Sequence, residues 1–352
     1  MKQFNLPGAS AKLVIKDNVL AVISDTELTT VSSGIYNGGF RKVKAILNVS
    51  VPDGYSDSQL HDDPMNLVYD AKRNLEVSTD FVAMITAAKI ANMSMVTRQK
   101  DDVAISVVAT AGCRHGESSG EEIEASHAPG TINIIVILNG NPTDSCLVSL
   151  FLTATEAKTA ALIDYDIRSR YTGDSATGTI TDSLSVASTN QGEKLELGGP
   201  ASPIGQLVAN AVRQAVKEAA TKQDGQRLGR PLTRRLTERR MPIEKLAAEL
   251  SKIRAFNLDE KAIAVELERI LASDSLSSAF LLAAVKMDDD YKKGLIPNDF
   301  GDVDLLSARF GDLLSDQKGS GKSETDYAMA DLPPFTKQAL ITILQNSLAH
   351  KK

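Results

Sequence analysis

Two hydrophobic patterns alternate along the first 220 residues of the chain. In the first pattern, short runs rich in β-branched residues are separated by turns rich in Gly, Asn and Thr, which predicts β-strands. These runs lie at residues 12–15, 19–23, 43–51, 94–97, 103–110, 132–138 and 184–187. The first two flank Lys16, Asp17 and Asn18, and this arrangement predicts a hairpin.

In the second pattern, apolar residues recur at helical spacing. The helical segments are residues 64–75, 144–165 and 203–220. Asp144 or Ser145 is expected to cap the middle helix, and Ser202 followed by Pro203 is expected to start the last one. Hairpins combined with helical crossovers predict an α+β fold, a layered mixed or antiparallel sheet with packed helices, over residues 1–220.

The character of the chain changes at residue 221. Residues 221–240 carry seven basic and two acidic side chains, a net charge of +5. Such a run predicts a solvated basic linker, with a patch for nucleic acid or an acidic partner as the alternative. Residues 241–352 then show only helical patterns, and we expect a small all-helical appendage. Its expected role is packing, or binding of a protein partner or a second copy of the chain.

Composition narrows the class of protein. The chain has 352 residues, 42% of them hydrophobic and 24% charged, which is typical of a globular protein of about two domains. A net charge of −6 argues against general nucleic-acid binding. The N-terminus lacks an apolar leader, and apolar stretches such as residues 134–138 are too short to span a membrane. Two isolated cysteines, Cys113 and Cys146, favour a reduced, cytoplasmic protein with no membrane partner.

Neither a metal site nor a thiol nucleophile is strongly indicated. The four histidines are not spaced as metal ligands usually are, so no metal and no cofactor are expected. They are His61, His115, His127 and His350. Cys113 follows a predicted strand and His115 lies two residues further on, so a Cys–His nucleophile is conceivable, although cysteines at such places are more often structural fillers.

Four segments combine small turns, hydroxyls, one acid and one base. They are residues 32–39 running on to 48–52, residues 128–134, residues 153–158 and residues 176–183. Glycine turns let backbone N–H groups approach a substrate carbonyl closely. Glu156 and Lys158 lie on a predicted helix among apolar neighbours, so at least one should be half-buried and need a partner. A purely structural ion pair is the alternative.

In this order, the four segments resemble the adenosylcobinamide amidohydrolase family of corrinoid salvage, over about residues 24–220. The most specific parts are residues 129–133, 153–158, 177–182 and 203–205, and residues 84–88 give further support. The resemblance implies hydrolysis of the amide between a corrin propionate and aminopropanol. The products would be adenosylcobyric acid and 1-amino-2-propanol, and the cobalt-containing corrinoid would be the substrate. Cys113 and Ile180 depart from the family's usual residues.

Amide hydrolysis needs a nucleophile, a base, stabilisation of the oxyanion and a proton for the leaving amine. In one scheme, which we favour, a hydroxyl of Thr177, Thr179 or Thr181 attacks with help from Lys158 or Asp182. In the other, Glu156 or Asp182 activates a water molecule. Backbone N–H groups of Gly130, Thr131 or Gly178 would form the oxyanion hole, and Asn133 or Asn48 would orient the amide. The resemblance adds Ser33, Asn37 and Thr86 as substrate-binding residues.

Two other functions fit the same residues. The first is a corrinoid-binding or delivery module that has lost catalysis. The second is an amidase or acyl-transfer enzyme that acts on another substrate, because proteins of one fold carry out different functions.

Overall fold

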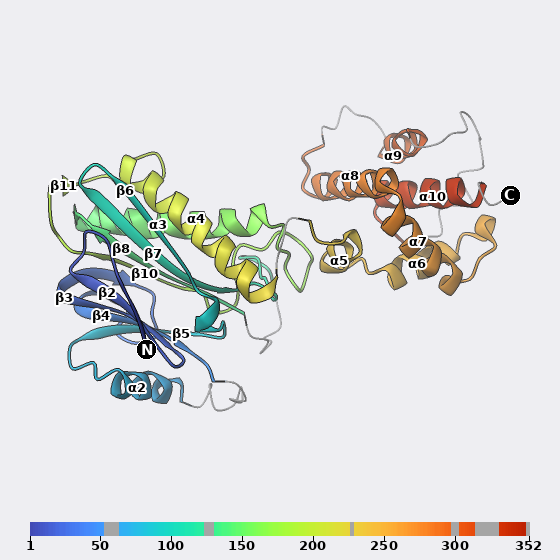
Figure 1. The fold of residues 1–352 in the computed structure, drawn as a ribbon. Helices are drawn as coiled ribbons and strands as arrows, with labels where there is room; N and C mark the ends of the chain where they lie inside the picture. Colours follow the sequence, from blue (N-terminus) through green and yellow to red (C-terminus); the bar gives the residue numbers. More distant parts are fainter. Residues whose placement is uncertain (53–62, 123–129, 226–228, 297–302, 314–330, 350–352) are drawn as a thin grey trace. The chain divides into compact units, whose positions relative to one another are not determined.

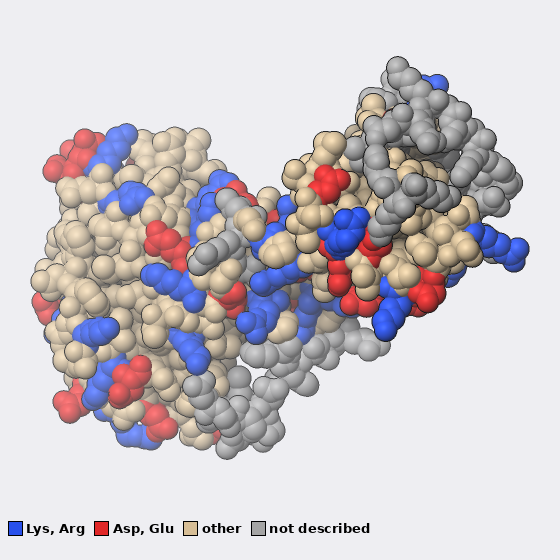
Figure 2. Space-filling model, turned by 45° about the vertical axis from the view of Figure 1, so that its right-hand side comes forward, with Lys and Arg blue, Asp and Glu red and all other residues tan. Residues whose placement is uncertain are grey.

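The computed structural model describes residues 1–52, 63–122, 130–225, 229–296, 303–313 and 331–349. The chain divides into two compact units, Met1–Gly229 and Arg230–Lys352, and each is described by itself. The basic segment at 221–240 contains the end of the last helix of the first unit and the first helix of the second. On the face of the molecule shown in Figure 2, Lys and Arg side chains lie interspersed with Asp and Glu.

A nine-stranded mixed sheet, curled into a half-barrel, forms the centre of the first unit (Figure 1). Its main path is β1 (Lys2–Asn5), β2 (Ala11–Lys16), β3 (Val19–Ser32), β10 (Ser183–Ser188), β8 (Thr131–Asn139), β7 (Val103–Gly112) and β6 (Ser94–Lys100). β4 (Gly39–Ser50) pairs with β3, and β5 (Phe81–Thr86) pairs with β4. Among the described strands of this sheet, β8 with β10 and β4 with β5 are the parallel pairs, and the other pairs are antiparallel. A separate two-stranded sheet joins β9 (Asn141–Pro142) to β11 (Lys194–Leu195).

The curl begins in β3. Pairing of β3 with β4 is irregular between Ile23 and Leu28, and such bulges bend a strand. The first half of β3 therefore pairs with β2, and its second half pairs with β10. The predicted hairpin at Lys16–Asn18 is confirmed, with Asp17 in the left-handed region at φ 51°.

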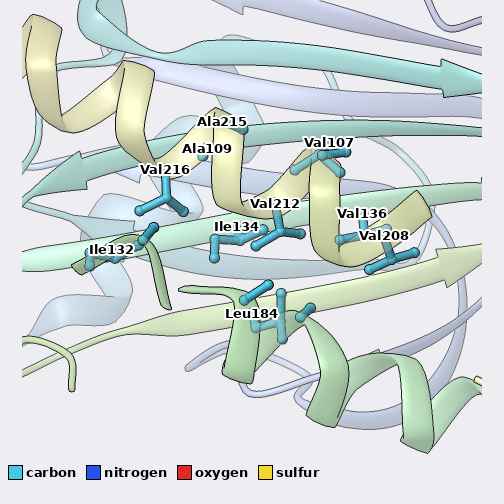
Figure 3. Packing of buried hydrophobic residues seen from close by; sticks show 14 of the residues in the cluster. Val107, Ala109, Ile132, Ile134, Val136, Leu184, Val208, Val212, Ala215 and Val216 are labelled. Carbon is cyan, nitrogen blue, oxygen red and sulfur yellow. The ribbon is translucent and has the colours of Figure 1, made fainter. Parts of the chain in front are cut away.

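Helices cover the outer face of the curled sheet. α3 (Asp144–Asp164) and α4 (Pro203–Asp224) pack on β7, β8 and β10, where Val208 and Val212 of α4 meet Ile134 and Val136 of β8 (Figure 3). α2 (Pro64–Asn74) packs on β4 and β5. Along β8, alternate residues such as Ile135 face an inner apolar core instead. The predicted α+β class with a mixed sheet and packed helices is confirmed.

Local sequence explains most element ends. Ser202 caps α4 as predicted, with its hydroxyl accepting from Gly205 N at 3.1 Å. The cap of α3 is Thr143 and not Asp144 or Ser145, because the Thr143 hydroxyl accepts from Cys146 N at 3.1 Å. β1 and β5 were not predicted. β1 is a polar edge strand, and β5 is a short apolar run without the alternation that marks a half-buried strand.

One described helix, α3, is long and apolar enough to cross a bilayer, and α7 with α8 would match such a span only as a sharply bent pair. In the first unit, α3 buries Leu147, Leu150 and Ala154 in the apolar core between the helices and the outer face of the sheet. Burial on the inward face is what a core helix of a globular domain shows.

The second unit is helical, as predicted. It contains α5 (Leu232–Glu238), α6 (Ile243–Ser251), α7 (Glu260–Ser273), α8 (Ser275–Lys292), α9 (Val303–Asp312) and α10 (Pro334–Ala349). α10 is anchored by the fully buried Phe335 and Leu340. Asp288 of α8 caps it, because the carboxylate accepts from Phe335 N at 3.0 Å and Thr336 N at 2.7 Å. Burial raises the pKa of Asp288, and these N–H donors oppose that rise.

Gly205, in the Pro-Ile-Gly motif that starts α4, is a structural requirement. A Cβ atom at this position would lie 1.9 Å from the carbonyl oxygen of Gly199, whereas a Cβ at Gly199 meets nothing within 4 Å. We expect Gly205→Ala to lower the free energy of unfolding of the first unit by about 1–3 kcal/mol, because backbone must move to relieve the overlap. Thermal unfolding should show the loss as roughly 3–10 °C. Gly199→Ala is the matched control, and equal melting temperatures for the two variants would contradict this role.

Candidate active site

At one end of the inner face, the side chains change from apolar to polar. Asn48 of β4, Thr86 of β5, Thr110 of β7 and Asn133 of β8 lie there, each no more than 2% exposed. We call these four residues the polar layer. The inward residues next along the same strands belong to the apolar inner core. The polar layer therefore closes the core at the end where β8 and β10 begin.

Hydrogen bonds join the polar layer across the curled sheet. Asn133 Nδ2 donates to Asn48 Oδ1 at 2.8 Å and to the carbonyl of Ile85 at 2.9 Å. Asn48 Nδ2 donates to Thr110 Oγ1 at 2.9 Å. Asn133 Oδ1 is buried and accepts no hydrogen bond from the described residues. Burying an unpaired amide oxygen is unfavourable, so the layer is not a purely stabilising feature.

An ion pair lies beside this layer. Lys158 of α3 places Nζ 2.5 Å from Oδ2 of Asp182, which directly precedes β10, and the side chains are 13% and 16% exposed. Oδ1 of Asp182 also accepts from Thr179 Oγ1 at 2.5 Å and from Ile132 N at 2.9 Å. Thr179 N donates to Oδ2 at 3.1 Å. Four donors fill the roughly four acceptor positions of a carboxylate, so Asp182 is fully engaged.

Gly178 lets the chain pass directly over the ion pair. A Cβ atom at Gly178 would lie 2.6 Å from Asp182 Oδ2 and 2.9 Å from Lys158 Nζ. Glu117 holds the passing chain, because Glu117 N donates to the Gly178 carbonyl at 2.9 Å and the Glu117 carbonyl accepts from Thr177 N at 2.9 Å. Gly178 N also donates to that carbonyl at 3.2 Å, so this predicted oxyanion donor is already engaged.

Two threonine hydroxyls lie at the start of β8. Thr131 Oγ1 and Thr181 Oγ1 are 2.8 Å apart, and Thr181 Oγ1 also donates to the Gly130 carbonyl at 3.2 Å. Thr131 is buried, and Thr181 is exposed. Thr177, in contrast, turns its hydroxyl away from Asp182, toward Ser119 at 3.1 Å.

Cys113 and His115 follow the end of β7. Burial, with Asp224 and Asp182 nearby, raises the pKa of the Cys113 thiol well above its ordinary value, so the thiol stays protonated. His115 is half-buried, and burial lowers the pKa of its imidazole, with Arg170 and Arg114 adding to the effect and Asp224 opposing it. No bond between the two side chains is present in the described structure, so the conceivable Cys–His nucleophile does not form.

Most of the predicted site residues meet at this end of the sheet. They are Asn48, Thr86, Gly130, Thr131, Asn133, Lys158, Gly178, Thr179 and Asp182. Thr177 lies beside them and bonds to Ser119. Sequence reasoning left out Thr110, which belongs to the polar layer. Its position at the end of the strand predicted at residues 103–110 was the available signal.

Three predicted residues lie apart from the ion pair. Glu156 is exposed on α3, and Lys158 is the half-buried one of the two. Asn37 sits in a turn at φ 53° and donates to the Phe81 carbonyl at 3.1 Å. Ser33 Oγ accepts from Leu184 N at 3.0 Å, at the start of β10.

No group of three or more His, Cys, Asp or Glu suited to a metal ion occurs among the described residues. His61, His127 and His350 lie outside the described residues, as do residues 128 and 129 of the second predicted segment.

Comparisons with known proteins identify the family. The family model described as CbiZ, adenosylcobinamide amidohydrolase, matches residues 8–228. An adenosylcobinamide amidohydrolase of Methanosarcina mazei is 29% identical over 202 residues, which cover 56% of this chain and 92% of that protein. An uncharacterised protein of Methanocaldococcus jannaschii is 30% identical over 200 residues, which cover 50% and 76%.

Among solved structures, a protein of Pyrococcus horikoshii matches at 11% identity and a TM-score of 0.30, covering 60% of this chain and 83% of that one. The family match, in contrast, spans more than half of the chain and contains the polar layer and the ion pair. The chain therefore belongs to the adenosylcobinamide amidohydrolase family.

Proposed function

We propose that this protein hydrolyses the aminopropanol amide of adenosylcobinamide to adenosylcobyric acid and 1-amino-2-propanol. One observation carries the proposal beyond family membership. Segments far apart in the sequence bring a half-buried ammonium, Lys158, to a carboxylate, Asp182, which also binds the backbone of Ile132 at the start of β8. The corrinoid is the substrate, and its cobalt belongs to the substrate.

Lys158 is suited to stabilise the oxyanion of the tetrahedral intermediate. An ammonium has three N–H donors, and Lys158 uses one of them on Asp182. No other partner of Lys158 Nζ occurs among the described residues, so the remaining donors are available to a substrate oxygen, in a half-buried place where charge acts more strongly than in water. The backbone at Gly178 passes close to one side of the ammonium, so a substrate oxygen would approach from another side.

Asp182 acts as a positioning residue in this proposal. Its carboxylate is filled by Lys158, Thr179 and Ile132, and it fixes the direction of the ammonium relative to the start of β8. The Thr179 hydroxyl donates to Asp182, whose carboxylate already accepts four hydrogen bonds. Asp182 is therefore poorly suited to act as the base for this hydroxyl. We therefore assign the attack to a water molecule, as in the second scheme, although neither Asp182, which is filled, nor Glu156, which is exposed, is suited to activate it.

The activity test uses the purified full chain and adenosylcobinamide. We expect stoichiometric release of 1-amino-2-propanol, measured by mass spectrometry, together with adenosylcobyric acid. A visible spectral shift without any release would instead indicate a corrinoid-binding module. Turnover of unrelated amides alone would indicate an amidase with another substrate.

Lys158→Ala should lower kcat about 100- to 1000-fold, the usual effect of removing one oxyanion donor. Asp182→Asn should also lower kcat, because the ammonium loses its anchor while the side-chain shape is kept. The matched control is Asp164→Asn. Asp164 lies on α3, the helix of Lys158, and its carboxylate pairs with Arg213 and Lys217. We expect its steady-state rate to stay near that of the wild type. Unchanged kcat in Lys158→Ala would contradict the assignment.

Glu156 provides a separate test. It shares α3 with Lys158 but is exposed, and it is not among the hydrogen-bond partners of the ion pair in the described part of the chain. We expect Glu156→Gln to keep kcat and KM within about twofold of wild type, since a carboxylate facing solvent cannot reach the reacting water. A large loss of kcat with an unchanged melting temperature would show that Glu156 takes part in catalysis and would contradict this prediction.

A further inference from the structure

We infer that His115 is the proton-transfer residue of this site, taking a proton from the attacking water and giving it to the leaving amine. This inference rests on the proposed amide hydrolysis and names a residue that the family resemblance did not supply.

The reaction needs such a group, and the other candidates are poorly suited. Amide hydrolysis requires a base for water and an acid for the amine nitrogen. Asp182 is filled by four donors, and Glu156 is exposed outside the cluster. Cys113 is buried and protonated. Lys158 is held as an ammonium partner of Asp182.

Backbone geometry brings the backbone and Cβ of His115 to Gly130, the residue before β8. A Cβ atom at Gly130 would lie 3.0 Å from the His115 carbonyl oxygen, 3.5 Å from its Cβ and 3.4 Å from Cβ of Thr179. His115 and Thr179 therefore flank the same glycine. The residues that follow are held firmly, because Gly116 bridges to Ser169 and Glu117 bridges to Gly178, the glycine over the ion pair. The polypeptide that carries His115 thus leads directly to the Lys158–Asp182 pair.

The protonation state of His115 agrees with this role. Burial lowers the pKa of the imidazole below its usual value of about 6.5, the guanidinium groups of Arg170 and Arg114 lower it further, and Asp224 opposes them. The resting imidazole is therefore neutral at pH 7 and ready to accept a proton. His115 is half-buried, so water can reach it.

The step balances as follows. A water oxygen forms a bond to the amide carbon while the neutral imidazole takes one water proton, and the carbonyl electron pair moves to the oxygen facing Lys158. When the intermediate collapses, that pair re-forms the carbonyl and the C–N bond breaks. The bonding electrons go to nitrogen, which takes the proton from the imidazolium. Water is thereby divided between the carboxylic acid and the amine, and His115 returns to its neutral form.

The test is a pH profile of kcat/KM for aminopropanol release, which reports ionisation of the free protein. Wild-type activity should fall as pH drops through the His115 pKa, below about 6.5. His115→Gln should lose roughly 100-fold or more and should lack this acidic limb. Added imidazole should restore part of the rate to His115→Ala, an effect that a purely structural histidine would not show.

Arg114→Gln serves as the electrostatic control. Arg114 is exposed and lies outside the proposed machinery. Removing a cation that lowers the pKa of His115 should raise that pKa, so the acidic limb should move to higher pH while the plateau rate is kept. Melting temperatures of all variants establish that each one is folded.

The outcomes separate the two proposals. A wild-type protein that releases no aminopropanol would overturn the proposed function, and the role of His115 with it. An active wild type with an unchanged rate and an unchanged acidic limb in His115→Gln would overturn the role of His115 alone. Loss of rate in His115→Gln with the acidic limb retained, and no rescue of His115→Ala by imidazole, would also overturn it.

Discussion

The four-donor carboxylate of Asp182 is the interaction on which the rest of the site depends. It receives Lys158 from α3, the backbone of Ile132 at the start of β8, and both the backbone and the hydroxyl of Thr179. One side chain thus connects an outer helix to the starts of two parallel strands. Removing one partner of such a half-buried pair leaves an uncompensated charge, so the geometry of the ammonium and that of the strand starts are coupled.

The curl of the sheet provides the second constraint. Asn48 and Asn133 are 85 residues apart, yet their side chains bond inside the half-barrel because β3 bends and brings β4 and β5 across from β8. The polar layer thereby closes an apolar core at the edge where the ion pair lies. The apolar inner core and the polar groups at its end make this end of the sheet suited to bind a small polar part of a substrate.

Most of the fold was predictable from the local sequence pattern, and the elements that this pattern did not predict were missed for physical reasons. Continuous runs rich in β-branched residues marked β7 and β8, and the Ser202 cap marked α4. β5 was missed because it is short and Ala83 and Met84 interrupt its β-branched residues, so its apolar run fits a buried helix equally well. The contact between Lys158 and Asp182 could not be read from the chain, since it depends on how α3 lies on the sheet. Because α3 is apolar on nearly every side, the sequence also could not show that Lys158 faces inward and Glu156 outward.

The central claim is that Lys158 faces the oxygen of the reacting carbonyl group. A crystal structure of the protein with the product adenosylcobyric acid bound tests it most directly, through the distance from Lys158 Nζ to the carboxylate that the reaction releases. The account predicts a hydrogen bond of about 3 Å, with Lys158 still paired to Asp182. A product carboxylate bound well away from Lys158, with the ion pair undisturbed, would contradict it.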